Sequence, residues 1–257
     1  MPSLARRYAD EIHNERGYWA TWEPNVHLTL GTCGPVVDGV FRPEGELGDF
    51  TIDFATSSDP TASDTDYSSR EGLRLSFQTR AMTEPAAGLP LGTAGAQIAF
   101  TRTQAVVLAA KGAREDRIAD QNKLRRQILA SAGTPFGIPD GWFVITHLVR
   151  CASATVIVAL GAGAEIKVSA QADLTGGVAD LANASIGLAV QNESNIGYKM
   201  LARDGATPLF RGLRLKRHWL RQPRLETLGP AGPDSELEGM FEELSPDVID
   251  RDLASTN

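Results

Sequence analysis

Cysteine is scarce in this chain, because Cys33 and Cys151 are the two thiols in 257 residues. Two distant cysteines cannot build a disulfide framework, and they lack the paired spacing of a zinc site. We therefore expect both thiols to be small core residues in a reducing compartment. The first ten residues already carry Arg6, Arg7 and Asp10 without an apolar stretch, which argues against a secretory signal. We expect the intact chain to be cytoplasmic.

Long apolar runs are absent as well. The longest uncharged run, Cys151 to Ala164, is diluted by Ser, Thr and Gly and is shorter than the roughly 20 residues of a spanning helix. No transmembrane helix is therefore expected. A membrane-spanning strand needs only about 9 to 11 residues, so any membrane activity of this chain has to come from strands.

The signatures of the common enzyme classes are also missing. No GxxxxGKS/T phosphate loop, GxSxG elbow, HExxH zinc helix or CxxC pair occurs in the sequence. The histidines, His13, His27, His147 and His218, have no carboxylate or cysteine at metal-ligand spacing, and His147 fits a core position. We expect no catalytic cluster, metal or cofactor, although distant residues can still assemble an enzyme site.

What the chain does have is apolar and polar residues that alternate at strand spacing. Residues 73–80 and 164–174 alternate in this way, which predicts half-buried strands. Residues 98–109, 184–190 and 208–215 are further candidate strands. A last β-rich run, Trp142 to Leu160, is longer than the roughly 3 to 10 residues usual for a strand, so it has to bend, bulge or split.

Helical spacing occurs near the N-terminus and in the middle of the chain. Residues 4–14 predict a short amphipathic helix, and residues 114–130 predict a central helix that Gly133 ends. Residues 18–54 are broken by glycines and predict short strands with tight turns, whereas 55–72 predict a long exposed loop. Because strands and helices do not alternate regularly, we expect an α+β fold. It would be a mostly antiparallel twisted sheet with long amphipathic strands, a central helix and terminal helices.

The C-terminal residues 233–257 differ from the rest in charge. They hold eight acidic residues and one arginine, a net charge of −7 that equals the net charge of the whole chain. After a capping box at Ser235 and Glu238, apolar residues recur at helical spacing, and Pro246 is expected to end the helix. These apolar residues are Leu237, Met240, Phe241, Leu244 and Val248. We expect an acidic amphipathic helix docked on the body, the alternative being an ordinary helix with a solvated charged face.

A joint rich in Pro and Gly separates this tail from the body. We therefore divide the chain into a body (residues 1–222), an exposed linker that a protease can reach (223–234) and a tail (235–257). A dense basic stretch ends the body and comprises Arg211, Arg214, Lys216, Arg217 and Arg221. The chain is acidic overall, with an isoelectric point of about 5.2, so a nucleic-acid partner is not expected. An anionic membrane surface needs only a local patch such as this one.

The order of these elements resembles the N-terminal, pore-forming domain of gasdermins. A short amphipathic helix is followed by the segments GTAGAQIAFTRTQAVVLAA, WFVITHLVRCASATVIVAL and PLFRGLRLKR. Bacterial gasdermins look similar in outline, being a pore-forming domain followed by a short inhibitory C-terminal peptide. They commonly carry an acylated cysteine near the N-terminus, whereas Ser3 and Leu4 stand there in this chain. A member of this family with this sequence would either use no lipid anchor or attach one to another residue.

The resemblance implies an autoinhibited pore-former. After a protease removes the tail, the body would oligomerise and insert β-hairpins from 73–109 and 142–174 into the inner membrane, causing cell death in antiviral defence. The implied membrane-strand residues include Ala164, Ile166, Val168, Ala170, Ala172 and Leu174. The basic stretch Arg211 to Arg221 would meet anionic lipid, and the apolar stripe of the tail would be the inhibitor.

Two other hypotheses compete with this one. The chain can be a non-enzymatic binding or assembly module, in which the strand faces are core and the tail docks a partner or a second copy. It can also be an enzyme whose site is assembled from distant residues. Removing the tail separates the first two, because only a pore-former should then release dye from liposomes.

Overall fold

The computed structural model describes residues 3–22, 28–69, 73–78, 94–170, 189–216 and 234–256. Its helices are α1 (Leu4–Arg16), η1 (Leu47–Phe50), α2 (Gln121–Ser131), α5 (Asp234–Gly239) and α6 (Pro246–Thr256). Its short N-terminal strands are β1 (Trp19–Ala20), β2 (Thr32–Gly34), β3 (Val36–Val37), β4 (Val40–Phe41), β5 (Gly45–Glu46) and β6 (Thr56–Ser58). The remaining strands are β7 (Ser63–Ser68), β8 (Leu73–Gln78), β9 (Ala94–Phe100), β10 (Val106–Ile118), β11 (Phe143–Ala159), β12 (Glu165–Ala170), β13 (Ala189–Ser194), β14 (Ile196–Leu215) and β15 (Phe241–Glu243).

A large sheet forms the centre of the molecule. Its strands follow the order β1, β14, β11, β10 and β6, with β7 also paired to β10. Strands β10, β11 and β14 are 13, 17 and 20 residues long. All pairings among the described strands of this sheet are antiparallel. The predicted α+β fold with a mostly antiparallel sheet of long strands is therefore confirmed.

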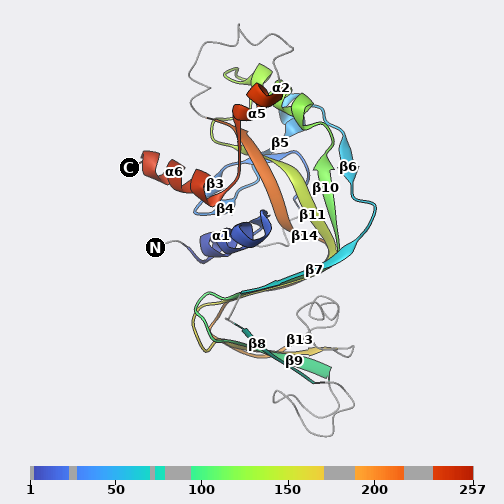
Figure 1. The fold of residues 1–257 in the computed structure, drawn as a ribbon, viewed down its shortest axis with the longest axis vertical. Helices are drawn as coiled ribbons and strands as arrows, with labels where there is room; N and C mark the ends of the chain where they lie inside the picture. Colours follow the sequence, from blue (N-terminus) through green and yellow to red (C-terminus); the bar gives the residue numbers. More distant parts are fainter. Residues whose placement is uncertain are drawn as a thin grey trace.

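A second sheet continues four strands of the first. In the large sheet β7, β10, β11 and β14 lie side by side, and in the second sheet β8, β9, β12 and β13 lie side by side in the same order. Each strand of the second sheet is thus joined along the chain to its counterpart in the first. Figure 1 shows the second sheet below the large one, with α1 and α6 to one side of the large sheet.

We define two hairpins from this arrangement. The first hairpin consists of β7 and β8 antiparallel to β9 and β10, and the second consists of β11 and β12 antiparallel to β13 and β14. Adjacent arms of the two hairpins also pair with each other, through β10 with β11 and β9 with β12. The four arms therefore form one bent, four-stranded ribbon.

Backbone hydrogen bonds hold this ribbon together through the bend. The amide of Ala159 donates to the carbonyl of Ala105 at 3.0 Å, and the amide of Phe100 donates to the carbonyl of Ala164 at 2.8 Å. The bend also needs left-handed backbone conformations, which Gly163 adopts with φ +80°. Asn195 adopts the same region with φ 52°, and asparagine tolerates it better than most residues. The predicted bend or bulge within residues 142–160 is seen as register shifts along β11 and as this bend at its end.

Three local expectations are wrong. Residues 55–72 are not one loop, because β6 and β7 pair with β10 through their backbones although most of their side chains are exposed. Residues 114–118 continue β10, so the central helix begins only after its N-cap Asp120. Residues 98–109 are divided between β9 and β10. Residues 161–163 lie between β11 and β12, which continue one arm from sheet to sheet.

The core lies between the large sheet and the elements that cover it. Helix α1 begins at Ser3, whose hydroxyl accepts from the amide of Arg6, and it buries Tyr8, Ala9 and Ile12. The C-terminal elements contribute to the same apolar cluster. Cys33 and Cys151 are buried, as expected, and burial raises the pKa of each thiol to about 12.

Candidate regulatory interface

The C-terminal segment, residues 234–256, docks on the large sheet as helix, strand and helix. The single amphipathic helix expected here is wrong, because residues 241–243 form β15 instead. Pro246 does not end a helix but begins α6, where its missing amide hydrogen costs nothing. The apolar spacing is consistent with a helix, but the backbone of residues 241–243 pairs with the edge of β14 instead.

Strand β15 extends the sheet at the end of β14. Phe241 lies opposite Leu215, Glu242 opposite Arg214 and Glu243 opposite Leu213. Outside these three pairs, the amide of Lys216 donates to Met240 at 2.9 Å, and the amide of Leu244 donates to Gly212 at 2.8 Å. The segment therefore covers an edge of the strand that forms the last arm of the second hairpin.

The apolar residues predicted to dock are all buried. They are Leu237, Met240, Phe241, Leu244 and Val248, none more than 7% exposed. Each belongs to the main apolar cluster, together with Ile249. Fully burying one side chain of this size contributes about 1.5 to 3 kcal/mol before chain entropy is subtracted. Leu253 on α6 is 55% exposed and marks the outer face of the segment.

Arg214 is the polar centre of the interface. Its side chain is 2% exposed, and its Nε donates to Glu242 at 2.8 Å. Its two terminal nitrogens donate to both carboxylate oxygens of Asp252, at 2.6 and 2.9 Å. The guanidinium carbon also lies 4.7 Å from the centre of the Phe143 ring. Burial by itself lowers the pKa of Arg214. The hydrogen bonds that Arg214 donates to Asp252 and Glu242, together with their negative charges, have a larger effect and raise its pKa above the ordinary value.

A second buried arginine joins the segment to the N-terminal helix. Arg6 is 6% exposed, and its Nε forms an ion pair with Asp10 one turn along α1. Its Nη2 donates to the carbonyl oxygen of Pro246 at 3.0 Å and to Asp250 at 3.1 Å. Sequence reasoning did not find this contact, because Arg6 and Asp10 form an ordinary i,i+4 pair and nothing in the pattern points to residues 246–250.

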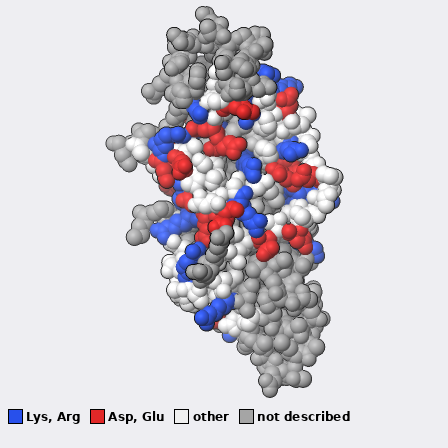
Figure 2. Space-filling view, viewed as in Figure 1, with Lys and Arg blue, Asp and Glu red and all other residues white. Residues whose placement is uncertain are grey.

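Further charged contacts surround these two arginines. Lys216 donates to the carbonyl oxygen of Gly239 at 2.7 Å, and Arg251 forms an ion pair with Glu242. Arg125 of α2 lies 3.9 Å from Glu238 of α5. Figure 2 shows acidic and basic side chains interspersed on this face of the molecule. The acidity of the tail is thus matched by basic residues of the body.

The basic stretch 211–221 is not one surface patch. Side chains alternate along β14, so Arg211 lies on the opposite face of the strand from Arg214. Arg211 lies 4.3 Å from the centre of the Tyr18 ring, whereas Arg214 and Lys216 contact the C-terminal segment. Arg214 is buried, so in the docked state it cannot serve as a lipid contact. Arg217 and Arg221 lie outside the described residues, as do positions 223–233 of the joint.

The candidate membrane strand is only partly described. Ala164 and Ile166 are buried, and Ile166 lies opposite the buried Ile98 in β9. The backbone register places Val168 opposite Ala96 and Ala170 opposite Ala94. Their own side chains lie outside the description, as do Ala172 and Leu174.

The opposite face of this second sheet is mostly polar where it is described, with Ala99 as an apolar position. Arg74 and Ser76 of β8 are exposed, and Gln97, Glu165 and Lys167 are half-buried. Phe100 and Ala96, which alternate with these positions along β9, are buried. The second sheet therefore has the two-faced character predicted from the alternation.

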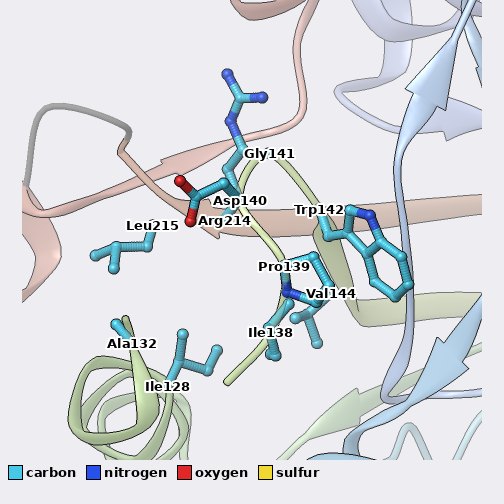
Figure 3. A pocket seen from close by; sticks show the side chains of 10 residues that line it. All are labelled: Ile128, Ala132, Ile138, Pro139, Asp140, Gly141, Trp142, Val144, Arg214 and Leu215. Atoms are coloured by element: carbon cyan, nitrogen blue, oxygen red, sulfur yellow. The ribbon is translucent and has the colours of Figure 1, made fainter. Parts of the chain in front are cut away.

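A small cavity lies beside the interface, between α2, the loop 138–142 and β14. It measures about 20 Å³, which is room for a single water molecule. Its lining, shown in Figure 3, comprises Ile128, Ala132, Ile138, Pro139, Asp140, Gly141, Trp142, Val144, Arg214 and Leu215. The cavity is too small for a substrate, so we treat it as a packing defect of the interface.

Neither the models of known protein families nor the curated proteins give a match to this sequence. Within the described residues, no group of three or more His, Cys, Asp or Glu side chains is placed to hold a metal ion. The described helices are all too short or too polar to cross a membrane.

Proposed function

We propose that this protein is an autoinhibited pore-former similar to gasdermins, in which the C-terminal segment holds two hairpins in a folded state. A protease that cuts the joint 223–234 releases the segment. The body then oligomerises and inserts the hairpins into the inner membrane, killing the cell as a defence. In the intact state the protein is cytoplasmic, and it needs neither a cofactor nor a nucleic acid.

The observation that carries the proposal is the place where the segment docks. It pairs with residues 213–215 of β14, and β14 is also an arm of the second hairpin. Removing the segment would uncover this backbone edge, the apolar surface under Leu237 to Ile249 and the buried charge of Arg214. Such a surface is unstable in water, so the body would gain by associating with lipid or with other copies.

The geometry of the hairpins supports the same proposal. The arms β9–β10, β11–β12 and β13–β14 run without a helix between the two sheets, where apolar and polar positions alternate; the arm β7–β8 includes residues 70–72, outside the described ranges. Lipid on one side and water on the other require this alternation in a membrane strand. Within the described residues, no further strand pairs with the outer side of β8 or β13. These edges would allow a neighbouring copy to extend the sheet.

A liposome assay tests the proposal. A recognition site for a specific protease is placed within residues 223–233 of the full chain, and dye release from vesicles with anionic lipid is followed after cleavage. We expect release after cleavage and none from an uncleavable version of the same insertion. If the protein is an assembly module, removal of the segment should reduce stability or association without dye release. If it is an enzyme, cleavage should cause neither dye release nor loss of association.

A disulfide lock makes the assay specific to the docked segment. Leu213→Cys together with Glu243→Cys places two thiols directly opposite each other on β14 and β15. The native thiols are buried with raised pKa values, so they compete little for this bond. Cleavage of the locked protein should release dye only after a reductant is added. Release from the cleaved, still oxidised protein would show that undocking of the segment is not required.

A further inference from the structure

Helix α1 contacts the bend of the first hairpin through one carboxylate. Oε1 of Glu11 accepts a hydrogen bond from the hydroxyl of Tyr67 at 2.8 Å and another from the hydroxyl of Ser69. The same oxygen forms an ion pair with Arg102 at 3.0 Å. Tyr67 lies in β7, Ser69 directly after it and Arg102 between β9 and β10. Glu11 therefore binds both arms of the hairpin where they bend.

The partners of Glu11 are themselves part of the bend. The hydroxyl of Ser69 accepts from the amide of Val106 at 2.7 Å, and the amide of Ser69 donates to the carbonyl of Val106 at 2.9 Å. Ser69 is 3% exposed. Breaking its bond to Glu11 would free the hydroxyl that holds the first residue of β10. The contact thus reaches the backbone of the hairpin and not only its surface.

Two further features strengthen this contact. Arg7, one turn before Glu11 on α1, donates to the side chain of Gln104, which has a left-handed backbone with φ 61°. Burial and the Glu11 carboxylate raise the pKa of Tyr67, so its hydroxyl stays a donor at all physiological pH values. The turn 101–105 is therefore tied to α1 by two side chains from neighbouring turns of the helix.

The other side of the same helix holds the C-terminal segment. Arg6 donates to Pro246 and Asp250 of α6, five residues before Glu11 contacts the bend. Because a helix of 13 residues moves as a stiff body, a shift at one contact is transmitted to the other. Release of the C-terminal segment, as proposed above, does not by itself require this connection between α6 and the bend.

We propose that α1 is a two-ended latch that ties the docked C-terminal segment, through Arg6, to the bend of the first hairpin, through Glu11. While the segment is docked, α1 stays in place and the bend stays closed. When α6 leaves, α1 loses the contacts of Arg6 with α6, and the bend opens more readily. The use of this opening for membrane insertion rests on the proposed function, but the latch itself does not.

Hydrogen exchange in the intact protein, without any membrane, tests the latch. Glu11→Gln keeps the shape of the side chain and removes its charge, so we expect the amides of Ser69, Phe100 and Val106 to exchange about tenfold faster. Glu44→Gln, a matched change at an exposed position, should leave these rates unchanged. Unaltered exchange at the bend in Glu11→Gln would overturn the latch, whatever the liposome assay shows.

The connection between the two ends needs a second variant. Asp250→Ala removes a contact of Arg6 on α6 and touches none of the bend residues. We expect it to speed exchange at Val106 about twofold as well as within α6. Faster exchange confined to residues 241–256 would show that the two ends are independent, which also overturns the proposal. Tyr67→Phe combined with Glu11→Gln should add little to Glu11→Gln alone, because both remove the same contact.

Discussion

Arg214 and Asp252 lie 38 positions apart in the chain and share two hydrogen bonds, of 2.6 and 2.9 Å, in a bidentate pair. The pair joins the last strand of the second hairpin to the last helix of the molecule. The same guanidinium also binds Glu242 in β15. One buried arginine is therefore bonded to both the strand and the second helix of the docked segment.

Replacing this arginine should be costly. In Arg214→Met the carboxylates of Glu242 and Asp252 lose their shared guanidinium partner, and breaking a buried pair in this way costs about 3 to 5 kcal/mol. We expect the free energy of unfolding, measured with urea, to fall by this amount. Arg150→Met is the control, because Arg150 is 52% exposed in its pair with Asp116 and should lose under about 1 kcal/mol. Equal losses in both variants would contradict the assigned role of Arg214.

The apolar residues of the segment give a second prediction. Leu244 is 3% exposed, and Leu244→Ala should lower the free energy of unfolding by about 2 to 5 kcal/mol through lost burial and the cavity left behind. Leu253→Ala is the matched control, since Leu253 is 55% exposed and should change stability by less than about 0.5 kcal/mol. Urea denaturation of both variants measures the difference. A loss in Leu253→Ala as large as that in Leu244→Ala would mean that α6 buries its other face.

The sequence predicted the class of fold and the docking residues well, for a physical reason. Alternation along residues 164–167 reports which of these side chains face the core, and this is a local property of a strand. The stripe Leu237 to Val248 likewise showed that these residues had to be buried. Neither pattern says which surface buries them, because the partner lies far away in the chain.

The errors arose where tertiary pairing decided the backbone. Residues 241–243 fit a helix by spacing but became β15, because β14 offered an edge. Residues 63–68 are too polar to suggest a strand, yet β10 pairs with their backbone. The role of Arg6 depends on a contact between the two ends of the chain, and the role of Asp252 on Arg214, 38 positions earlier; one sequence holds no signal for either contact.

Stability should fall in mild acid because of two half-buried histidines, His13 and His147. Burial lowers the pKa of His147, with Arg211 adding to the effect and Glu115 opposing it, and burial also lowers the pKa of His13. Between the lowered folded pKa and the ordinary value of 6.5, the unfolded chain binds more protons than the folded one, so stability is lost as pH falls through this window.

The variant His147→Gln tests this account. It removes one of the two titrating groups, so the loss of stability between about pH 7.5 and 5.5 should be smaller than in the native chain. Urea midpoints at both pH values measure it. Adding His13→Gln should reduce the loss further. A pH profile identical to that of the native protein would assign the acid sensitivity to other groups.

The bend of the second hairpin offers a final test through two neighbouring glycines. Gly163 has φ +80°, whereas Gly161 has no such restriction, and an added Cβ would meet no atom within 4 Å at either position. Gly163→Ala should therefore lose about 1 to 2 kcal/mol through backbone strain alone. Gly161→Ala should be neutral or slightly stabilising, because alanine restricts the unfolded chain. Thermal unfolding of both variants measures the cost of backbone strain alone, because an added methyl group contacts no other atom at either site. If both substitutions were neutral, residue 163 would tolerate another backbone conformation, and the bend between β11 and β12 would not depend on it.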